Sequence, residues 1–322
     1  MMKTSLTGIK PTHIPHVGNY LGAIRPALRL SETYRTAYFI ADYHALTTVR
    51  DPAALRGHVH DVAATWLACG LDPDKTLFYR QSDVPEVFEL SWVLACITAT
   101  GQLERGVAYK DAIAKGEAPN AGVFYYPVLM AADILLFDTD VVPIGADQRQ
   151  HVELARDMAA RVNHLFGEGT LVLPEPLITE APLVPGTDGT KMSKSKGNTI
   201  PLFESGKKLR KLCLSIVTGS ETLEEPKKAE GTPLFEIYRQ LATADESAAL
   251  EAKLAAGNFG WGHAKEALYE VIERDFAPMR ERFTALRADP AGLDAVLARG
   301  ADQARGIARA TLDRLRARTG IR

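Results

Sequence analysis

Cysteine is scarce in this chain of 322 residues, and the three cysteines stand far apart. Cys69, Cys96 and Cys213 form no C-x-x-C pair, which argues against a disulfide framework, a cysteine zinc site and an iron–sulfur cluster. Long apolar runs are also missing. No stretch approaches the roughly 18 apolar residues of a membrane span, and the first residues lack the apolar run of a signal peptide. We therefore expect a cytoplasmic protein that does not enter a membrane.

An excess of one charge is absent as well. Lys and Arg number 38 and Asp and Glu number 40, so the formal net charge is -2 and the whole chain is no general nucleic-acid binder, although a local basic patch remains possible. No histidine spacing matches a zinc helix such as H-E-x-x-H, so we expect no protein-held metal. With 46% hydrophobic and 24% charged residues, the composition is that of an ordinary enzyme with about two domains.

Strands and helices alternate in the first half of the chain. Apolar runs predict strands at 3–7, 37–42, 75–79 and 141–144, and helical spacing predicts helices at 18–31, 51–69, 85–98, 127–137 and 147–166. This alternation is typical of an α/β fold, a Rossmann-like doubly wound parallel sheet, with ligands at the carboxyl ends of the strands. Residues 170–197 are rich in Pro and Gly and are expected to form a loop.

After residue 198 the pattern becomes helical and richer in charge. Residues 301–322 contain six arginines and two aspartates. We therefore divide the chain into a catalytic domain, 1–198, and an all-helical C-terminal domain, 199–322.

Two short segments suit phosphate groups. His16, Gly18 and Asn19 lie between a predicted strand and a predicted helix, where unpaired backbone N–H groups attract anions. Lys191 and Lys194 lie three residues apart in a glycine-flanked loop, with Met192, Ser193 and Ser195 beside them. Two ammonium groups at that spacing stabilise the charge that develops on a leaving pyrophosphate.

The pentapeptide Lys191–Ser195 resembles the KMSKS signature of class I aminoacyl-tRNA synthetases. The segment His16–Asn19 resembles their HIGH signature, with Asn19 in place of the last histidine. The two signatures occur in the expected order, on either side of an α/β pattern. This resemblance implies ATP, accompanied by Mg²⁺, as a substrate.

An apolar helix with one carboxylate indicates the amino acid. Met130 and Asp133 are three residues apart and share a helix face. An indole N–H only donates, so a buried carboxylate acceptor matches it, and a thioether suits a flat aromatic ring. The segment from Tyr126 to Asp133 resembles the bacterial tryptophan branch of the family, whereas the tyrosine branch typically has glutamine at the position of Met130.

The resemblance covers essentially the whole chain and implies a set of site residues. It assigns phosphate chemistry to His16, Asn19, Lys191 and Lys194. It assigns ATP binding to Lys10, Pro11, Thr12, Gly18, Asn19, Gly145, Ala146, Asp147, Leu183, Lys191, Met192, Ser193, Lys194 and Ser195. It assigns tryptophan binding to Asp133, Met130, Tyr126, Gln148 and His44, with Tyr126 and Gln148 at the α-ammonium and His44 near the carboxylate.

Two positions depart from the family pattern. Lys10 stands where many members have glutamine, and Ala146 stands where many have glutamate, so the side-chain roles at these positions do not carry over. The implied partners are L-tryptophan, ATP, tRNA(Trp) and a second copy of the chain, with the segment 85–98 as one apolar candidate for the dimer contact. Phe235, Tyr238, Arg239 and Trp261 are weak candidates for contacting anticodon bases, although core packing is the favoured interpretation of the aromatic ones.

Three alternatives remain open at this point. A tyrosine-specific synthetase is opposed by Met130. A nucleotidyltransferase that makes a dinucleotide cofactor shares a histidine–glycine phosphate turn, but the long basic helical half argues against it. A non-catalytic tRNA-binding paralogue is opposed by the intact lysines at 191 and 194.

Overall fold

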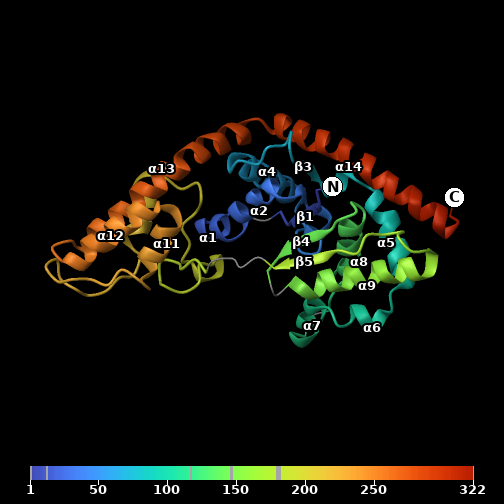
Figure 1. The fold of residues 1–322 in the computed structure, drawn as a ribbon, viewed down its shortest axis with the longest axis horizontal. Helices are drawn as coiled ribbons and strands as arrows, with labels where there is room; N and C mark the ends of the chain where they lie inside the picture. Colours follow the sequence, from blue (N-terminus) through green and yellow to red (C-terminus); the bar gives the residue numbers. More distant parts are fainter. Residues whose placement is uncertain (1, 12–13, 117, 146–147, 179–182, 322) are drawn as a thin grey trace.

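The protein is described by a computed structural model that covers residues 2–11, 14–116, 118–145, 148–178 and 183–321. Its centre is a five-stranded parallel sheet in the order β3-β2-β1-β4-β5 (Figure 1). The strands are β1 (Thr4–Ile9), β2 (Arg35–Ile40), β3 (Leu77–Arg80), β4 (Val141–Ile144) and β5 (Glu175–Ile178). Strand order therefore reverses between β1 and β4, as the prediction of a doubly wound sheet requires.

Helices cover both faces of this sheet. The larger helices of the first part are α4 (Pro52–Ala68), α5 (Glu86–Ile97), α8 (Ala121–Leu135) and α9 (Arg149–Phe166), and short ones are α3 (Asp42–Ala45), α6 (Thr100–Leu103) and α7 (Val107–Ala114). Side chains alternate along β2: Tyr38 and Ile40 enter one apolar cluster with α4, whereas Ala37 and Phe39 enter the other with α5 and α8. Since successive residues of a strand point to opposite faces, this alternation buries the sheet on both sides.

The predicted helix over 18–31 is a helical stretch in several pieces. It consists of α1 (Val17–Asn19), a π-helical turn η1 (Tyr20–Ile24), α2 (Arg25–Arg29) and a 3₁₀ turn η2 (Leu30–Glu32). A π turn inside a helix is uncommon and is frequent at functional sites. Here it follows directly on the histidine–glycine turn that the sequence singled out.

Two boundaries in the first half were predicted wrongly. β5 lies in the stretch that the Pro and Gly content assigned to a loop; it is a short edge strand, where Pro176 is tolerated. Helix α8 begins at Ala121 and not at Pro127, because the Asn120 side chain accepts a hydrogen bond from the Val123 N–H at 3.1 Å and so caps the helix. Pro127 lies inside that helix.

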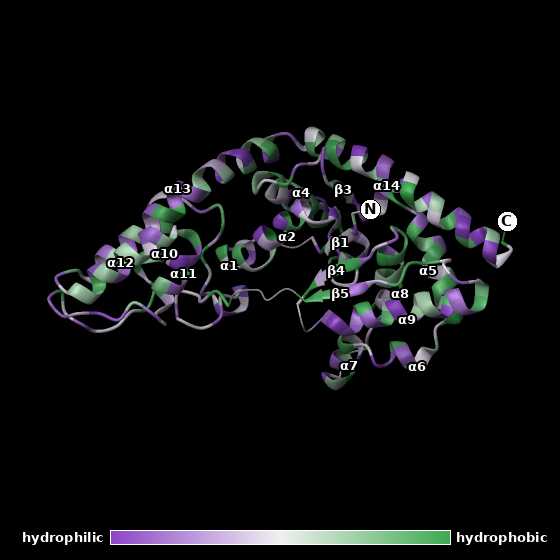
Figure 2. Ribbon diagram, viewed as in Figure 1, coloured by the Kyte–Doolittle hydropathy of each residue, from purple (hydrophilic) through white to green (hydrophobic). Residues whose placement is uncertain are grey.

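The second half is helical, as predicted. It contains α10 (Gly206–Leu214), α11 (Pro233–Leu241), α12 (Ala244–Ala256), α13 (Trp261–Ala288) and α14 (Pro290–Thr319). Helices α13 and α14 form an arch that runs from the helical part to the far side of the sheet (Figure 1). Both alternate hydrophilic and hydrophobic colours along their length, as expected of helices with one packed face (Figure 2). Among the described residues, no helix is long and apolar enough to cross a membrane.

Helix α14 lies directly on the edge strand β3. A Cβ atom built on Gly300 would lie 1.8 Å from the Phe78 carbonyl oxygen, so only glycine permits this approach. The same helix contributes Ala301, Ala304 and Leu312 to the apolar cluster of the sheet. The division at residue 198 stays a prediction, and any division has to accommodate the return of α14 to the sheet.

The aromatic residues proposed as weak candidates for anticodon contact lie in the core. Phe235, Tyr238 and Trp261 are buried, which supports the core interpretation, and Trp261 donates its indole N–H to Glu221 at 2.9 Å. Arg239 is more exposed and pairs with Glu236 at 2.6 Å.

Candidate active site

A cavity of about 940 Å³ opens at the carboxyl ends of β1, β2 and β4. Its wall includes Gly8 near the end of β1, Lys10 just after it, Ala41 after β2 and Ile144 at the end of β4. This is the switch point of the sheet, where open α/β folds bind ligands. All five residues predicted to bind the amino acid line it: His44, Tyr126, Met130, Asp133 and Gln148.

The Asp133 carboxylate is the charged group at the buried wall of this cavity. The residue is 2% exposed. Gln81 Nε2 donates to both Asp133 carboxylate oxygens at 2.8 Å, and His44 Nε2 lies 2.9 Å from Oδ2. Burial raises the pKa of Asp133, while the hydrogen bonds from His44 and Gln81 oppose that rise. A buried carboxylate needs hydrogen-bond partners, and the structure supplies two in His44 and Gln81.

His44 therefore does more than the sequence indicated. It was predicted near the carboxylate of the bound amino acid, and that contact stays a prediction. In the structure its ring lines the cavity and also contacts Asp133. Tyr126 also lines the cavity, and its hydroxyl lies 3.1 Å from His151 Nε2, a contact that holds the phenol in place.

The turn at residue 16 is closed by a reciprocal hydrogen-bonded cap. His16 Nδ1 accepts from the Asn19 backbone N–H at 3.3 Å, and Asn19 Oδ1 accepts from the His16 N–H at 3.1 Å. Burial and, to a lesser extent, the Lys194 charge lower the pKa of His16 from 6.5 to about 4. The imidazole is therefore neutral at neutral pH. Because Nδ1 accepts, the proton resides on Nε2, and His16 presents an N–H donor there.

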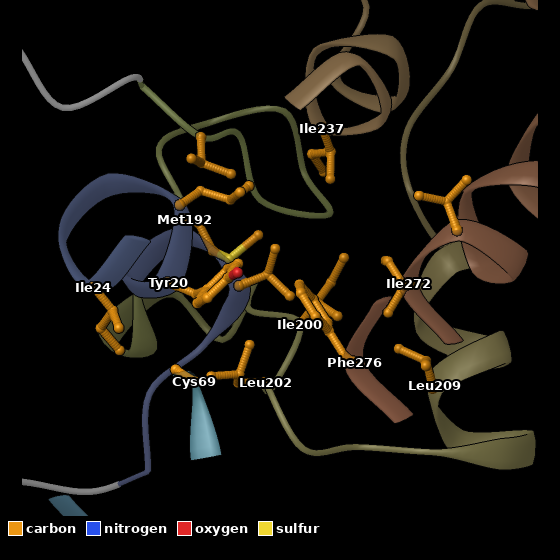
Figure 3. Packing of buried hydrophobic residues seen from close by; sticks show 14 of the residues in the cluster. Tyr20, Ile24, Cys69, Met192, Ile200, Leu202, Leu209, Ile237, Ile272 and Phe276 are labelled. Carbon is orange, nitrogen blue, oxygen red and sulfur yellow. The ribbon is translucent and has the colours of Figure 1, made fainter. Parts of the chain in front are cut away.

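The loop that carries Lys191 and Lys194, the lysine loop, lies against this turn. Met192 is buried, its Sδ lies 3.3 Å from the Gly18 backbone nitrogen, and its own N–H donates to the Val184 carbonyl at 3.0 Å. Figure 3 shows Met192, Tyr20, Ile200 and Phe276 gathered in one apolar group. The turn at residue 16 and the lysine loop, 175 residues apart in sequence, thus form one wall. Lys191 and Lys194 lie exposed on the lysine loop.

Asn198 holds the other end of the loop. Its Oδ1 accepts from the Ser193 N–H at 2.8 Å, and its Nδ2 donates to Asp188 at 2.7 Å and to the Lys191 carbonyl at 3.2 Å. A Cβ on Gly186 would lie 2.4 Å from the Asn198 amide, so glycine is required for this packing. The loop is therefore anchored by one buried thioether and one buried amide.

These features coincide with a known family. The family described as "tRNA synthetases class I (W and Y)" matches residues 3–277, most of the chain. The chain belongs to this family. Of the curated synthetases, the tryptophan–tRNA ligase of Bordetella parapertussis is 50% identical over 98% of this chain and 72% of its own length. That of Neisseria meningitidis is 48% identical over 99% of this chain and 98% of its own length.

A solved synthetase structure agrees with the fold. The tryptophanyl-tRNA synthetase of Campylobacter jejuni, in complex with ADP and tryptophan, superposes with a TM-score of 0.92 at 44% identity, and the match covers 98% of this chain and 99% of that one. A tyrosyl-tRNA synthetase of Archaeoglobus fulgidus, at 21% identity and a TM-score of 0.66, shares the fold. Within the synthetase family, these similarities favour the tryptophan branch over the tyrosine alternative, and the family match opposes the nucleotidyltransferase.

Not every residue expected to bind ATP in the synthetase lines the cavity. Lys10 does, but Pro11 is buried nearby, Gly145 accepts from the Gln148 N–H at 3.0 Å, and Leu183 is 72% exposed. Thr12, Ala146 and Asp147 lie outside the described residues. Ser193 and Ser195 hydrogen-bond to each other at 2.9 Å. The roles of these residues in nucleotide binding stay predictions.

Sequence reasoning missed Gln81 and Asn198, the two amides that hold the site together. Neither belongs to a signature, and nothing local in the sequence marks a buried amide. Asn198 could have been suspected because it follows the glycine that closes the loop. Among the described residues, no group of three or more His, Cys, Asp or Glu side chains could hold a metal.

Proposed function

We propose that this chain is a tryptophan–tRNA ligase whose cavity beside α8 binds the indole ring against Asp133 and Met130. The observation that carries this proposal is the Asp133 carboxylate: it is buried at the cavity wall, it is held by two hydrogen-bond donors, and a thioether lies one helical turn away. A ligand that donates from within an apolar ring, as an indole does, satisfies that arrangement. Full-length similarity to tryptophan–tRNA ligases supports the same conclusion.

The reaction needs no side-chain nucleophile. A tryptophan carboxylate oxygen attacks the α-phosphorus of ATP, and the bond from that phosphorus to the bridging oxygen of pyrophosphate breaks. The products are tryptophanyl-adenylate and pyrophosphate. A ribose hydroxyl of the 3′-terminal adenosine of tRNA then attacks the aminoacyl carbonyl, and AMP leaves. The protein contributes positioning and charge stabilisation.

The phosphate chain is assigned to the wall where the two signatures meet. His16 donates from Nε2, and Asn19, Lys191 and Lys194 meet the phosphate oxygens. Desolvation by the neighbouring protein atoms lowers the pKa of Lys194, which fits a lysine that is exposed but lies close to this wall. Gly18, Gly145 and Asp147 are assigned to the ribose and adenine. Magnesium enters with ATP as part of the substrate.

The amino group of tryptophan is assigned to Tyr126 and Gln148, which also line the cavity. The arginine-rich α14 and the helical part around α13 are proposed to contact tRNA through its phosphates, in a salt-dependent way. A homodimer and a cytoplasmic setting complete the proposal, and free thiols at Cys69, Cys96 and Cys213 are consistent with a reducing compartment.

Pyrophosphate exchange tests the function directly. Purified protein is given ATP, labelled pyrophosphate and one amino acid: tryptophan, tyrosine or phenylalanine. We expect exchange with tryptophan alone, and esterification of tryptophan when tRNA is added. Exchange with tyrosine instead would indicate the other branch of the family. No exchange with any amino acid, together with tRNA binding, would indicate a non-catalytic paralogue.

A further inference from the structure

The amide of Gln81 contacts the Asp133 carboxylate from behind the cavity. Gln81 follows β3 in the 3₁₀ turn η3 (Gln81–Asp83), is 1% exposed, and is not one of the described residues that line the cavity. Its Nε2 lies 2.8 Å from both Asp133 oxygens. A ligand in the cavity therefore meets Asp133 and not Gln81.

The orientation of this amide is fixed by its other end. Gln81 Oε1 accepts from the Tyr43 backbone N–H at 3.1 Å. If the amide were rotated by half a turn, its oxygen would face the carboxylate and its NH₂ would face a backbone N–H, so both contacts would be repulsive. The nitrogen must face Asp133.

These contacts also identify the oxygen that remains for a ligand. A carboxylate oxygen accepts about two hydrogen bonds. Asp133 Oδ2 receives His44 Nε2 at 2.9 Å and Gln81 Nε2 at 2.8 Å, whereas Oδ1 receives Gln81 alone among the described donors. Oδ1 therefore has the capacity to accept one more N–H.

We infer that Gln81 is a positioning residue that sets the selectivity of the cavity for an indole N–H, by holding the Asp133 carboxylate so that Oδ1 accepts it. This inference rests on the proposed function. Without Gln81, the buried Asp133 carboxylate keeps only the hydrogen bond from His44, so it binds a proton more readily. A protonated Asp133 offers a hydroxyl to the ligand, which no longer distinguishes an N–H donor from an isosteric group.

The test uses a pair of substrates that differ in that one group. Tryptophan is compared with 3-benzothienylalanine, in which sulfur replaces the indole N–H, by steady-state pyrophosphate exchange. Wild-type protein is expected to prefer tryptophan strongly in kcat/KM. Gln81→Leu is expected to lower that preference by at least about tenfold, mainly through KM for tryptophan.

Asn163→Leu is the matched control. Asn163 is also a buried amide with two hydrogen bonds to one partner residue, the Leu171 backbone, at 2.8 Å and 2.9 Å, but it lies away from the cavity. Its loss should lower thermal stability and leave the substrate preference unchanged. A Gln81→Leu protein that is folded and keeps the wild-type preference within about twofold would overturn the inference.

Gln81→Glu keeps the test decisive if the leucine variant does not fold. When the introduced carboxyl group is protonated, it has nearly the shape of the glutamine amide and donates from its hydroxyl to Asp133; when it is ionised, it repels Asp133. The other titratable groups that face Asp133 are His44 and Tyr79, whose contributions are also present in the wild type. We expect the preference of Gln81→Glu for tryptophan to recover relative to wild type as the pH falls from about 8 to about 6.

The outcomes separate the two proposals. If wild-type protein does not activate tryptophan, the proposed function fails. If wild-type protein does activate tryptophan and the ratio of Gln81→Glu to wild type is flat with pH, the function stands and the role of Gln81 fails.

Discussion

In the cavity beside α8, the carboxylate proposed to recognise the amino acid is buried and held by hydrogen bonds. In the lysine loop, the cations proposed to meet the phosphates are exposed, and the contacts that hold the loop lie in the backbone and side chains beneath them. Asp133 on α8 is held by His44 on α3 and Gln81 on η3. Lys191 and Lys194 lie on a loop whose anchors are Met192 and Asn198.

The difference matches the two proposed tasks, selection of the amino acid and stabilisation of pyrophosphate. Selecting a ring needs a rigid acceptor, because an analogue then leaves a buried charge unpaired. Stabilising a leaving pyrophosphate needs cations placed where the negative charge develops, on a loop that is accessible to the nucleotide.

Removing the rigid acceptor should have the largest effect on selectivity. We expect Asp133→Ala to lower the ratio of kcat/KM for tryptophan over phenylalanine by roughly 10³ or more, because a site built to hydrogen-bond one group discriminates by about 10⁴–10⁵. Pyrophosphate exchange with each amino acid gives the ratio. Asp138→Asn is the control, since that carboxylate lies at the surface just after α8 and pairs with Arg314. An unchanged ratio in Asp133→Ala would remove Asp133 from the recognition of the ring.

Removing one exposed cation of the lysine loop should affect rate and not selection. We expect Lys194→Ala to slow adenylate formation by about 10²–10³ while the Kd for tryptophan stays near wild type, because its charge acts on the developing pyrophosphate. Single-turnover kinetics and equilibrium titration measure the two quantities. Lys196→Ala, in the same loop, removes an exposed lysine that donates to Thr190 Oγ1 at 3.1 Å, and it should have a much smaller effect. Equal loss of rate and of tryptophan affinity in Lys194→Ala would contradict a transition-state role.

Loosening an anchor of the loop should have an intermediate effect. Asn198→Ala removes bonds to Ser193, Asp188 and the Lys191 carbonyl. We expect adenylate formation to slow by about tenfold with an unchanged ratio of tryptophan over phenylalanine, and stability to fall by about 1–3 kcal/mol because a buried N–H loses its acceptor. Rate, ratio and thermal unfolding are measured on the same preparation. A change in the ratio would show that the loop takes part in selection.

The smallest expected effect is a change in the pH at which one histidine titrates. His16 should titrate near pH 4 and not near 6.5, since burial and then Lys194 lower its pKa. A lowered pKa means that the unfolded chain binds a proton more tightly, so the contribution of His16 to stability is fully present above about pH 6.5 and declines as the pH falls toward about 4. Histidine NMR with a His16→Gln variant for assignment measures the value. A pKa near 6.5 would mean that the turn is open to water.

The sequence predicted four strands and most helices, because these depend on local patterns. Apolar runs and the Asp51–Pro52 start of α4 are read within a few neighbouring residues. It missed β5, which is too short and too rich in proline for a pattern, and it started α8 six residues late because an apolar helix does not mark its own first turn. It placed Tyr126, Met130 and Asp133 on one helix, which is correct, and all three line the cavity.

The sequence by itself determined the two signature segments, the carboxylate on an apolar helix and the alternation that makes the sheet. Each is set by residue type and spacing along one element, where side-chain chemistry and backbone period suffice. Only the tertiary structure decided what holds these groups. Gln81 reaches Asp133 across 52 residues, Gly18 meets Met192 across 174 residues, and Gly300 brings α14 onto Phe78. Such contacts come from packing between elements, and no periodicity within either partner specifies them.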